Sequence, residues 1–203
     1  MVLGCLWLGG WLFSLLMLVA AIGLAVEWLG MWRGSHAGPD ALLAGIPYLV
    51  PGIVALPWLR ADEATGRENV LFLLIVVWAS DIGAYVVGRL VGGPKLAPAI
   101  SPGKTWSGAV GGLIAAISVA WFFSGVLGAP PARGLLIGAC LGIASQAGDL
   151  LESAIKRGFG VKDSGRLIPG HGGLLDRIDG LLVAAPTAAL LAAYFGRGVA
   201  LWR

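Results

Sequence analysis

Long stretches without any ionisable side chain dominate this sequence. Residues 2–26 contain none, and neither do residues 109–131. A helix of about 20 apolar residues matches the thickness of the hydrocarbon core of a bilayer. Only 12% of the 203 residues are charged, about half the share typical of a soluble domain. We therefore predict an all-α, polytopic integral membrane protein with about six or seven transmembrane helices.

The apolar runs also predict where the helices lie. The first run is expected to form one long tilted helix or two short helices broken near Gly23. Met1-Val2-Leu3 lacks the basic residues of a secretory signal, so this run is interpreted as a retained span. Cys5 and Cys140 both lie in apolar runs, which favours buried thiols over a disulfide or a metal pair. The expected spans cover about residues 3–31, 41–59, 70–91, 107–127, 134–152 and 180–196.

Lysine and arginine residues divide unequally between the two sides of the predicted bundle. With the N-terminus placed outside, alternate loops collect nine on one side and five on the other. The side with more lysine and arginine is usually cytoplasmic. Segments 92–106 and 153–179 are therefore both predicted to face the cytoplasm. The nine are Arg33, Arg89, Lys95, Lys104, Lys156, Arg157, Lys162, Arg166 and Arg177.

Charge is concentrated in residues 156–179, "KRGFGVKDSGRLIPGHGGLLDRID", which hold eight of the 25 charged residues. Asp176 and Asp179 are three positions apart, so they share one face if a helix begins near Leu174. Two such carboxylates can hold a divalent cation such as Mg²⁺ together with phosphate oxygens. The alternative is that they are ordinary acids that complement the dipole at a helix N-terminus.

The neighbours of these acids favour the binding interpretation. Pro169-Gly170-His171-Gly172-Gly173 is rich in glycine, and its backbone N–H groups can form an anion-binding nest before a helix; otherwise it is a hinge. Asp149, Glu152, Ser153 and Lys156 are spaced as one polar stripe on a helix. A solvated helix end is the other interpretation, but Asp149 lies deep in its apolar run.

Two further features point to the same side of the membrane. Asp81 occupies the middle of an apolar run, where a carboxylate costs roughly 3 kcal/mol and marks a functional site more often than a structural one. The segment "SPGKTWSG", residues 101–108, resembles a phosphate-binding P-loop, but Pro98 stands where that motif requires glycine. Lys104 at a helix start can still bind phosphate. Carboxylates, cations and glycines together predict a site for phosphorylated compounds at the membrane surface, in a lipid enzyme or in a transporter of a phosphorylated solute. No basic patch with interleaved aromatic residues predicts nucleic-acid binding.

The segment "SAIKRGFGVKDSGRLIPGHGGLLDRID", residues 153–179, resembles the signature of phosphatidate cytidylyltransferases, which are also called CDP-diacylglycerol synthases. Residues 78–108, residues 145–157 and, weakly, "VEW" at 26–28 are also similar to that family. The resemblance covers most of the chain from about residue 70. It implies an N-terminal helical region at 1–69, shortened relative to the family, and a catalytic membrane region at 70–203.

The resemblance also implies an activity and a set of residue roles. The family transfers the cytidylyl group of CTP to phosphatidate and forms CDP-diacylglycerol and pyrophosphate for phospholipid biosynthesis. The implied setting is a bacterial cytoplasmic (inner) membrane with the active site facing the cytoplasm. Mg²⁺ is the implied cofactor, with a second cation as one option. Membrane lipids are implied partners, and a homodimer is one option. Asp149, Asp176 and Asp179 are the implied metal ligands, and Lys156 acts with them in catalysis. The implied substrate-binding residues are Asp81, Ser101, Lys104, Ser153, Arg157, Lys162, Asp163, His171, Gly172, Gly173 and Arg177.

Other interpretations remain at this point. CDP-alcohol phosphotransferases also use metal-bound aspartates, but Asp179-Gly180 is followed by Leu181-Leu182-Val183 and no later acid, so that motif is not met. A lipid kinase is distinguished by ADP release. A transporter of a phosphorylated solute and a shortened, inactive relative of the family both stay open.

Overall fold

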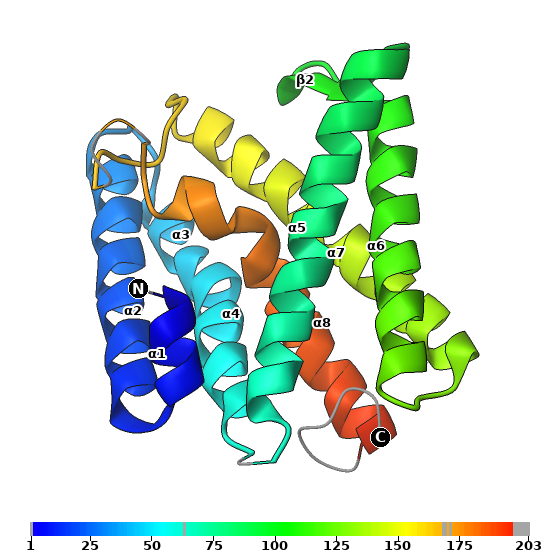
Figure 1. Cartoon of the computed structure of the whole chain (residues 1–203). Coiled ribbons are helices and arrows are strands. Elements are labelled where there is room, and N and C mark those ends of the chain that lie inside the picture. Colours follow the sequence, from blue (N-terminus) through cyan, green and yellow to red (C-terminus); the bar gives the residue numbers. More distant parts are fainter. Residues whose placement is uncertain (1, 63, 168–169, 171, 197–203) are drawn as a thin grey trace.

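The computed structural model describes residues 2–62, 64–167, 170 and 172–196, and most of them are helical (Figure 1). Within these residues, six segments are long and apolar enough to cross a membrane: Gly10–Arg33, Pro39–Arg60, Gly66–Val91, Trp106–Val126, Pro131–Gly158 and Leu175–Phe195. The prediction of a polytopic helical membrane protein is confirmed. The elements are α1 (Val2–Leu8), α2 (Gly10–Arg33), α3 (Pro39–Leu43), α4 (Gly45–Arg60), α5 (Gly66–Val91), β1 (Lys95–Ala97), β2 (Ser101–Thr105), α6 (Trp106–Val126), α7 (Pro131–Gly158) and α8 (Leu175–Gly196).

The outer surface of the bundle is apolar, as a lipid environment requires. Trp11 is 73% exposed and Leu90 is 80% exposed, whereas Leu24, Leu59 and Leu73 are fully buried between the helices. A soluble protein rarely exposes so many large apolar side chains together. The exposed residues therefore mark the surface that faces acyl chains.

The first apolar run is broken at Gly9, not near Gly23. Gly9 and Gly10 have φ angles of 66° and 54°, which L side chains rarely adopt, and the chain reverses there between α1 and α2. From Gly10 the helix α2 continues without interruption to Arg33. The alternative of two helices broken at Gly23 is wrong because a glycine inside a tightly packed helix does not by itself end it.

A two-stranded hairpin, which the sequence did not predict, precedes α6. Strands β1 and β2 are antiparallel, with Lys95 opposite Thr105 and Ala97 opposite Ser101. The Thr105 hydroxyl then caps α6 by accepting a hydrogen bond from the Gly108 backbone N–H at 3.1 Å. The cap fixes where α6 begins and thereby the position of the hairpin above it.

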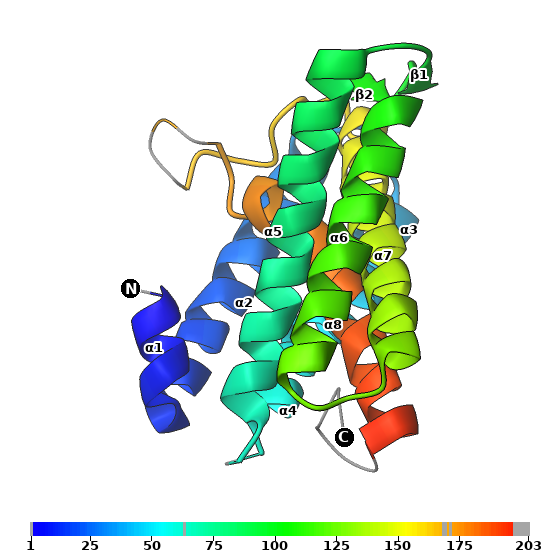
Figure 2. The same ribbon diagram turned by 45° about the vertical axis from the view of Figure 1, so that its right-hand side comes forward.

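The hairpin and the connection 159–174 lie at the same end of the bundle, as the sequence predicted for the loops that contain them. Figure 1 shows both at the top of the molecule, and Figure 2 shows them in its upper half after rotation. Helices α7 and α8, which flank the connection, pack against each other. This end of the bundle therefore collects the polar residues that the sequence singled out.

Candidate functional site

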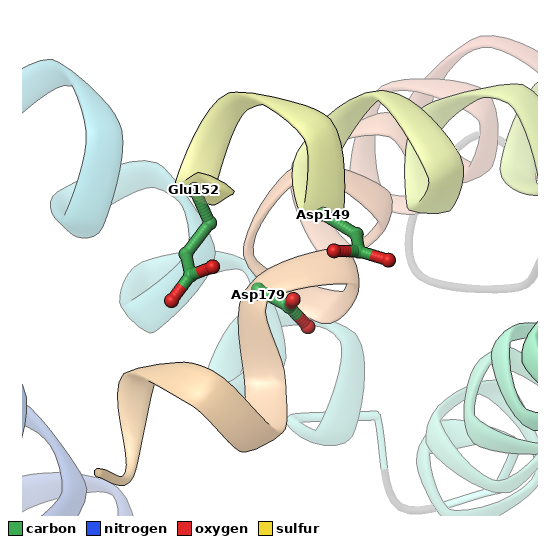
Figure 3. Close-up of side chains that lie close together, drawn as sticks. All are labelled: Asp149, Glu152 and Asp179. Carbon is green, nitrogen blue, oxygen red and sulfur yellow. The ribbon is translucent and has the colours of Figure 1, made fainter. Parts of the chain in front are cut away.

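Three carboxylates converge where α7 and α8 cross. Asp149 and Glu152 come from α7 and Asp179 from α8, and one oxygen atom from each lies within 4.8 Å of the others (Figure 3). Glu152 is 1% exposed, and its buried Oε1 atom accepts no hydrogen bond within the described residues. At a separation of 4.8 Å two carboxylates repel each other by roughly 3 kcal/mol at an effective dielectric constant of about 20. A divalent cation would relieve this repulsion and would fit an all-oxygen donor set.

Two glycines allow the helices to bring these acids together. A Cβ atom on Gly148 would lie 2.7 Å from the backbone oxygen of Asp179, and one on Gly180 would lie 2.8 Å from the Ser145 hydroxyl. Small residues at such positions let helices in a membrane approach closely. Each glycine is the chain neighbour of an acid of the cluster, so the close crossing itself places Asp149 beside Asp179.

Lys104 reaches the cluster from the hairpin. Its Nζ atom lies 2.6 Å from Oδ2 of Asp149, and both side chains are partly exposed. This ion pair joins β2 to α7, although Asp149 follows Lys104 by 45 positions in the sequence. It places a cation at the edge of the acid cluster, where a phosphate group would also be attracted.

Lys156 links the cluster to the start of α8. Its Nζ atom lies 2.7 Å from Oε2 of Glu152 and 2.7 Å from Oδ1 of Asp176. Asp176 also accepts backbone N–H groups of Ser164 at 3.1 Å and of Gly173 at 2.9 Å. Asp176 therefore lies outside the group of three acids. It binds the connection between α7 and α8 at Ser164 and Gly173 instead. Its role as a metal ligand stays a prediction.

A cavity of about 620 Å³ opens beside the acids, and it is lined by both polar and apolar residues. Lys104 and Asp149 form part of its wall, and Asp81 of α5 lies on the same wall. Arg89 also lines it and donates a hydrogen bond to the Tyr85 hydroxyl at 2.7 Å. The structure therefore places Asp81, predicted from its cost in an apolar run, at a cavity that reaches the acid cluster.

The other predicted residues are distributed around this site. Gly172 has a φ angle of 83°, and a Cβ atom there would lie 2.9 Å from Oδ2 of Asp176, so glycine suits this position. Arg157 donates to the backbone oxygen of Val161 at 3.0 Å. Lys162, Asp163 and Arg177 are exposed, and Ser101 and Ser153 are half-buried. His171 lies outside the described residues. No contact with a substrate tests these roles, so they stay predictions.

Two acids were missed as site residues. Glu152 was recognised only as part of a polar stripe, although its spacing of three from Asp149 was the available signal. Glu27, in the weak "VEW" motif of α2, carries no local signal of its position. Glu27 is buried and accepts hydrogen bonds from Ser164 and Leu174, which follow it by more than 130 positions. Only the tertiary structure reveals that contact.

The fold and the site define a class of protein: a helical membrane protein with three acids and two lysines gathered at one end of its bundle. Comparison with known proteins gives the family. Residues 39–195 match the Cytidylyltransferase family. The chain is 47% identical over 174 residues to a phosphatidate cytidylyltransferase of Brucella suis, which covers 85% of this chain and 63% of that protein. It is 44% identical over 156 residues to the protein of that name from Haemophilus influenzae, covering 71% and 54%. It is 36% identical over 198 residues to that from Rickettsia bellii, covering 91% and 81%.

This chain belongs to the cytidylyltransferase family. The match extends to residue 39, further toward the N-terminus than the motif resemblance that begins near residue 70. The chain spans 63% of the length of its Brucella suis relative. The predicted division into regions 1–69 and 70–203 stays a prediction.

Proposed function

We propose that this protein transfers the cytidylyl group of CTP to phosphatidate and releases CDP-diacylglycerol and pyrophosphate. The single observation that carries the proposal is the convergence of Asp149, Glu152 and Asp179 beside the 620 Å³ cavity, in a chain that belongs to the cytidylyltransferase family. The site would face the cytoplasm of a bacterial inner membrane. The excess of lysine and arginine at this end of the bundle supports that orientation.

For this reaction the protein must align the two substrates and neutralise the charge on the phosphates of CTP. An anionic phosphate oxygen of phosphatidate attacks the α-phosphorus of CTP, a new P–O bond forms, and the bond to the β-phosphate bridging oxygen breaks. Pyrophosphate leaves with the electron pair of that bond. Because the attacking oxygen is already ionised, no general base is needed, and in-line alignment with stabilised charge supplies the catalysis.

The three carboxylates would hold Mg²⁺. When bound there, the ion neutralises charge on the phosphate oxygens that develops during transfer. Lys156 holds Glu152 and Asp176 in place, and Lys104 stands at the edge of the cavity with its ammonium beside Asp149. Both lysines are suited to attract the phosphates of CTP. A second cation stays a prediction from the resemblance.

The surrounding residues complete the proposed binding site. The cavity wall with Asp81 and Lys104 is proposed to receive the headgroup of phosphatidate from the bilayer. Gly172 and Gly173 are also proposed substrate-binding residues, taken from the sequence. A homodimer stays a prediction. The further proposed phosphate contacts, taken from the sequence, are Ser101, Ser153, Arg157, Lys162, Asp163, His171 and Arg177.

Pyrophosphate release by the purified protein in detergent tests the proposal. The assay contains CTP, phosphatidate and Mg²⁺, and each is omitted in turn. We expect release only when all three are present, with CDP-diacylglycerol formed in equal amount. Asp176→Ala should abolish release, and Glu68→Gln, which alters an exposed carboxylate of α5, should not. Folded protein that binds CTP without releasing pyrophosphate would contradict the proposal and favour a transporter or an inactive relative.

A further inference from the structure

Glu27 is a buried carboxylate that, within the described residues, accepts hydrogen bonds from residues distant in the sequence. It lies in α2, is 3% exposed, and accepts a hydrogen bond from the Ser164 hydroxyl at 3.1 Å. It also accepts the backbone N–H groups of Leu174 at 2.8 Å and Leu175 at 2.9 Å. A buried anion is costly unless donors compensate it. These three donors all come from the connection between α7 and α8 and from the first residue of α8.

The contact of Glu27 continues directly to the proposed site. Ser164 donates its hydroxyl to Glu27 and its backbone N–H to Asp176. Asp176 in turn holds Lys156 at 2.7 Å, and Lys156 holds Glu152. A short chain of charge-assisted hydrogen bonds, ending in the ion pair of Lys156 with Glu152, therefore leads from α2 to the acid cluster. Such bonds are stronger than neutral ones and fix geometry.

The connection is shaped to admit the Glu27 carboxylate. A Cβ atom on Gly165 would lie 2.8 Å from Oε1 of Glu27, and one on Gly173 would lie 2.7 Å from the same oxygen. Both separations are too short for a side chain. Glycine at these two positions allows the backbone to wrap around the carboxylate.

Glu27 also completes the N-terminus of α8. The first N–H groups of a helix have no partner within that helix, and they favour a nearby negative charge. Here the carboxylate that accepts them comes from a different helix. The same charge thus orients the start of α8, where Asp176 and Asp179 lie in the first two turns.

From these contacts we propose that Glu27 is a positioning residue of the active site. Glu27 touches neither substrate, but it holds Ser164, Leu174 and Leu175 in place. Through Ser164 and Asp176 it thereby positions Lys156 and the acids. The inference rests on the proposed function for its catalytic consequence. The contact between Glu27 and the connection does not depend on that function.

Glu27→Gln is the decisive variant. In glutamine one oxygen is replaced by an NH₂ donor, so at least one of the three donors loses its acceptor whichever way the amide turns. Ser164→Ala removes only the hydroxyl bond. Glu68→Gln makes the same chemical change on an exposed carboxylate and serves as the matched control.

Two measurements on the full-length protein in detergent test the proposal. Hydrogen exchange of the backbone amides needs no substrate, and we expect those of Ser164, Leu174 and Leu175 to exchange about tenfold faster in Glu27→Gln, with the amides of α4 unchanged. The Mg²⁺ concentration for half-maximal pyrophosphate release should rise about 10- to 100-fold, because loss of supporting contacts around a metal site has effects of this size. Ser164→Ala should lie between Glu27→Gln and the wild type, and Glu68→Gln should match the wild type.

Unchanged exchange at Ser164, Leu174 and Leu175 in Glu27→Gln would overturn the proposal. So would faster exchange throughout the bundle with an unchanged Mg²⁺ requirement, since that describes a residue that only stabilises the fold. If Glu27→Gln does not yield folded protein, Ser164→Ala decides, and wild-type exchange with a wild-type Mg²⁺ requirement overturns the proposal. A wild type without pyrophosphate release refutes the proposed function instead, while the exchange comparison still decides the Glu27 contact.

Discussion

The helix pairs α6–α7 and α7–α8 pack by the same means but differ in what lies beside the contact. In α6–α7, a Cβ atom on Gly138 would lie 2.7 Å from the Ile117 Cα atom and 2.9 Å from the Ala116 backbone oxygen. In α7–α8, a Cβ atom on Gly148 would lie 2.7 Å from the Asp179 backbone oxygen. At the first crossing Gly138 packs against Ala116, Ile117 and Ala120; at the second the neighbours include Asp149 and Asp179. Close packing at glycine therefore occurs at more than one helix crossing of this bundle. Acids beside the α7–α8 crossing make that crossing a candidate metal site.

Removing charge at the α7–α8 crossing should have the largest effect on activity. Asp179→Asn keeps the shape of the side chain but takes one anion from the cluster. We expect pyrophosphate release to fall about 10³-fold, because several kcal/mol of charge stabilisation would be lost. The midpoint of thermal unfolding without metal should stay the same or rise, since repulsion with Asp149 and Glu152 is relieved.

The two effects in Asp179→Asn are measured on the same preparation. Glu68→Gln, far from the cluster, should change neither the activity nor the midpoint. Wild-type activity in Asp179→Asn, or an activity loss that only follows lost folded protein, would contradict a direct role for the acid.

Adding a methyl group at each crossing separates packing from chemistry. Gly138→Ala and Gly148→Ala both force backbones apart, and we expect each to lower the free energy of unfolding by about 1–3 kcal/mol. Only Gly148→Ala should lower the activity per folded molecule, by roughly tenfold, since it displaces Asp179. Thermal unfolding and pyrophosphate release measured together test this. Equal activity per folded molecule in the two variants would break the comparison.

An effect confined mostly to substrate binding is expected at the hairpin that lines the cavity. Lys104→Ala removes the ion pair with Asp149, and we expect catalytic efficiency with CTP to fall about tenfold, mostly through a raised KM. Lys95→Ala removes an exposed lysine of the same hairpin and should leave KM unchanged. Equal KM values for the two variants would show that Lys104 acts only through the net charge of the hairpin.

Much of the fold was predictable because lipid exposure demands long apolar runs. Each of the six spans overlaps a predicted run, although the first begins at Gly10 and not near residue 3. The break at Gly9 was not predictable, since glycine is frequent throughout the chain and only backbone geometry shows which one turns. The hairpin was missed for a related reason: β1 has only three residues, and β2 contains a proline and a glycine.

The site was predictable only where residues are close in sequence. Asp149 and Asp179 were singled out as charges that are costly or clustered, and the structure brings them together. Glu152, instead of Asp176, is the third acid of that group, because helix α7 turns Glu152 inward while the connection engages Asp176. That choice depends on side-chain direction and on backbone N–H groups, which sequence spacing does not describe.

Binding of Mn²⁺, measured by electron paramagnetic resonance as a substitute for Mg²⁺, tests the central claim most directly. The central claim is that Asp149, Glu152 and Asp179 together hold a divalent cation. We expect the wild type with CTP to bind Mn²⁺ stoichiometrically, and Asp149→Asn, Glu152→Gln and Asp179→Asn each to lose that binding, with Glu68→Gln unaffected. Stoichiometric Mn²⁺ binding that survives in all three variants would contradict the account.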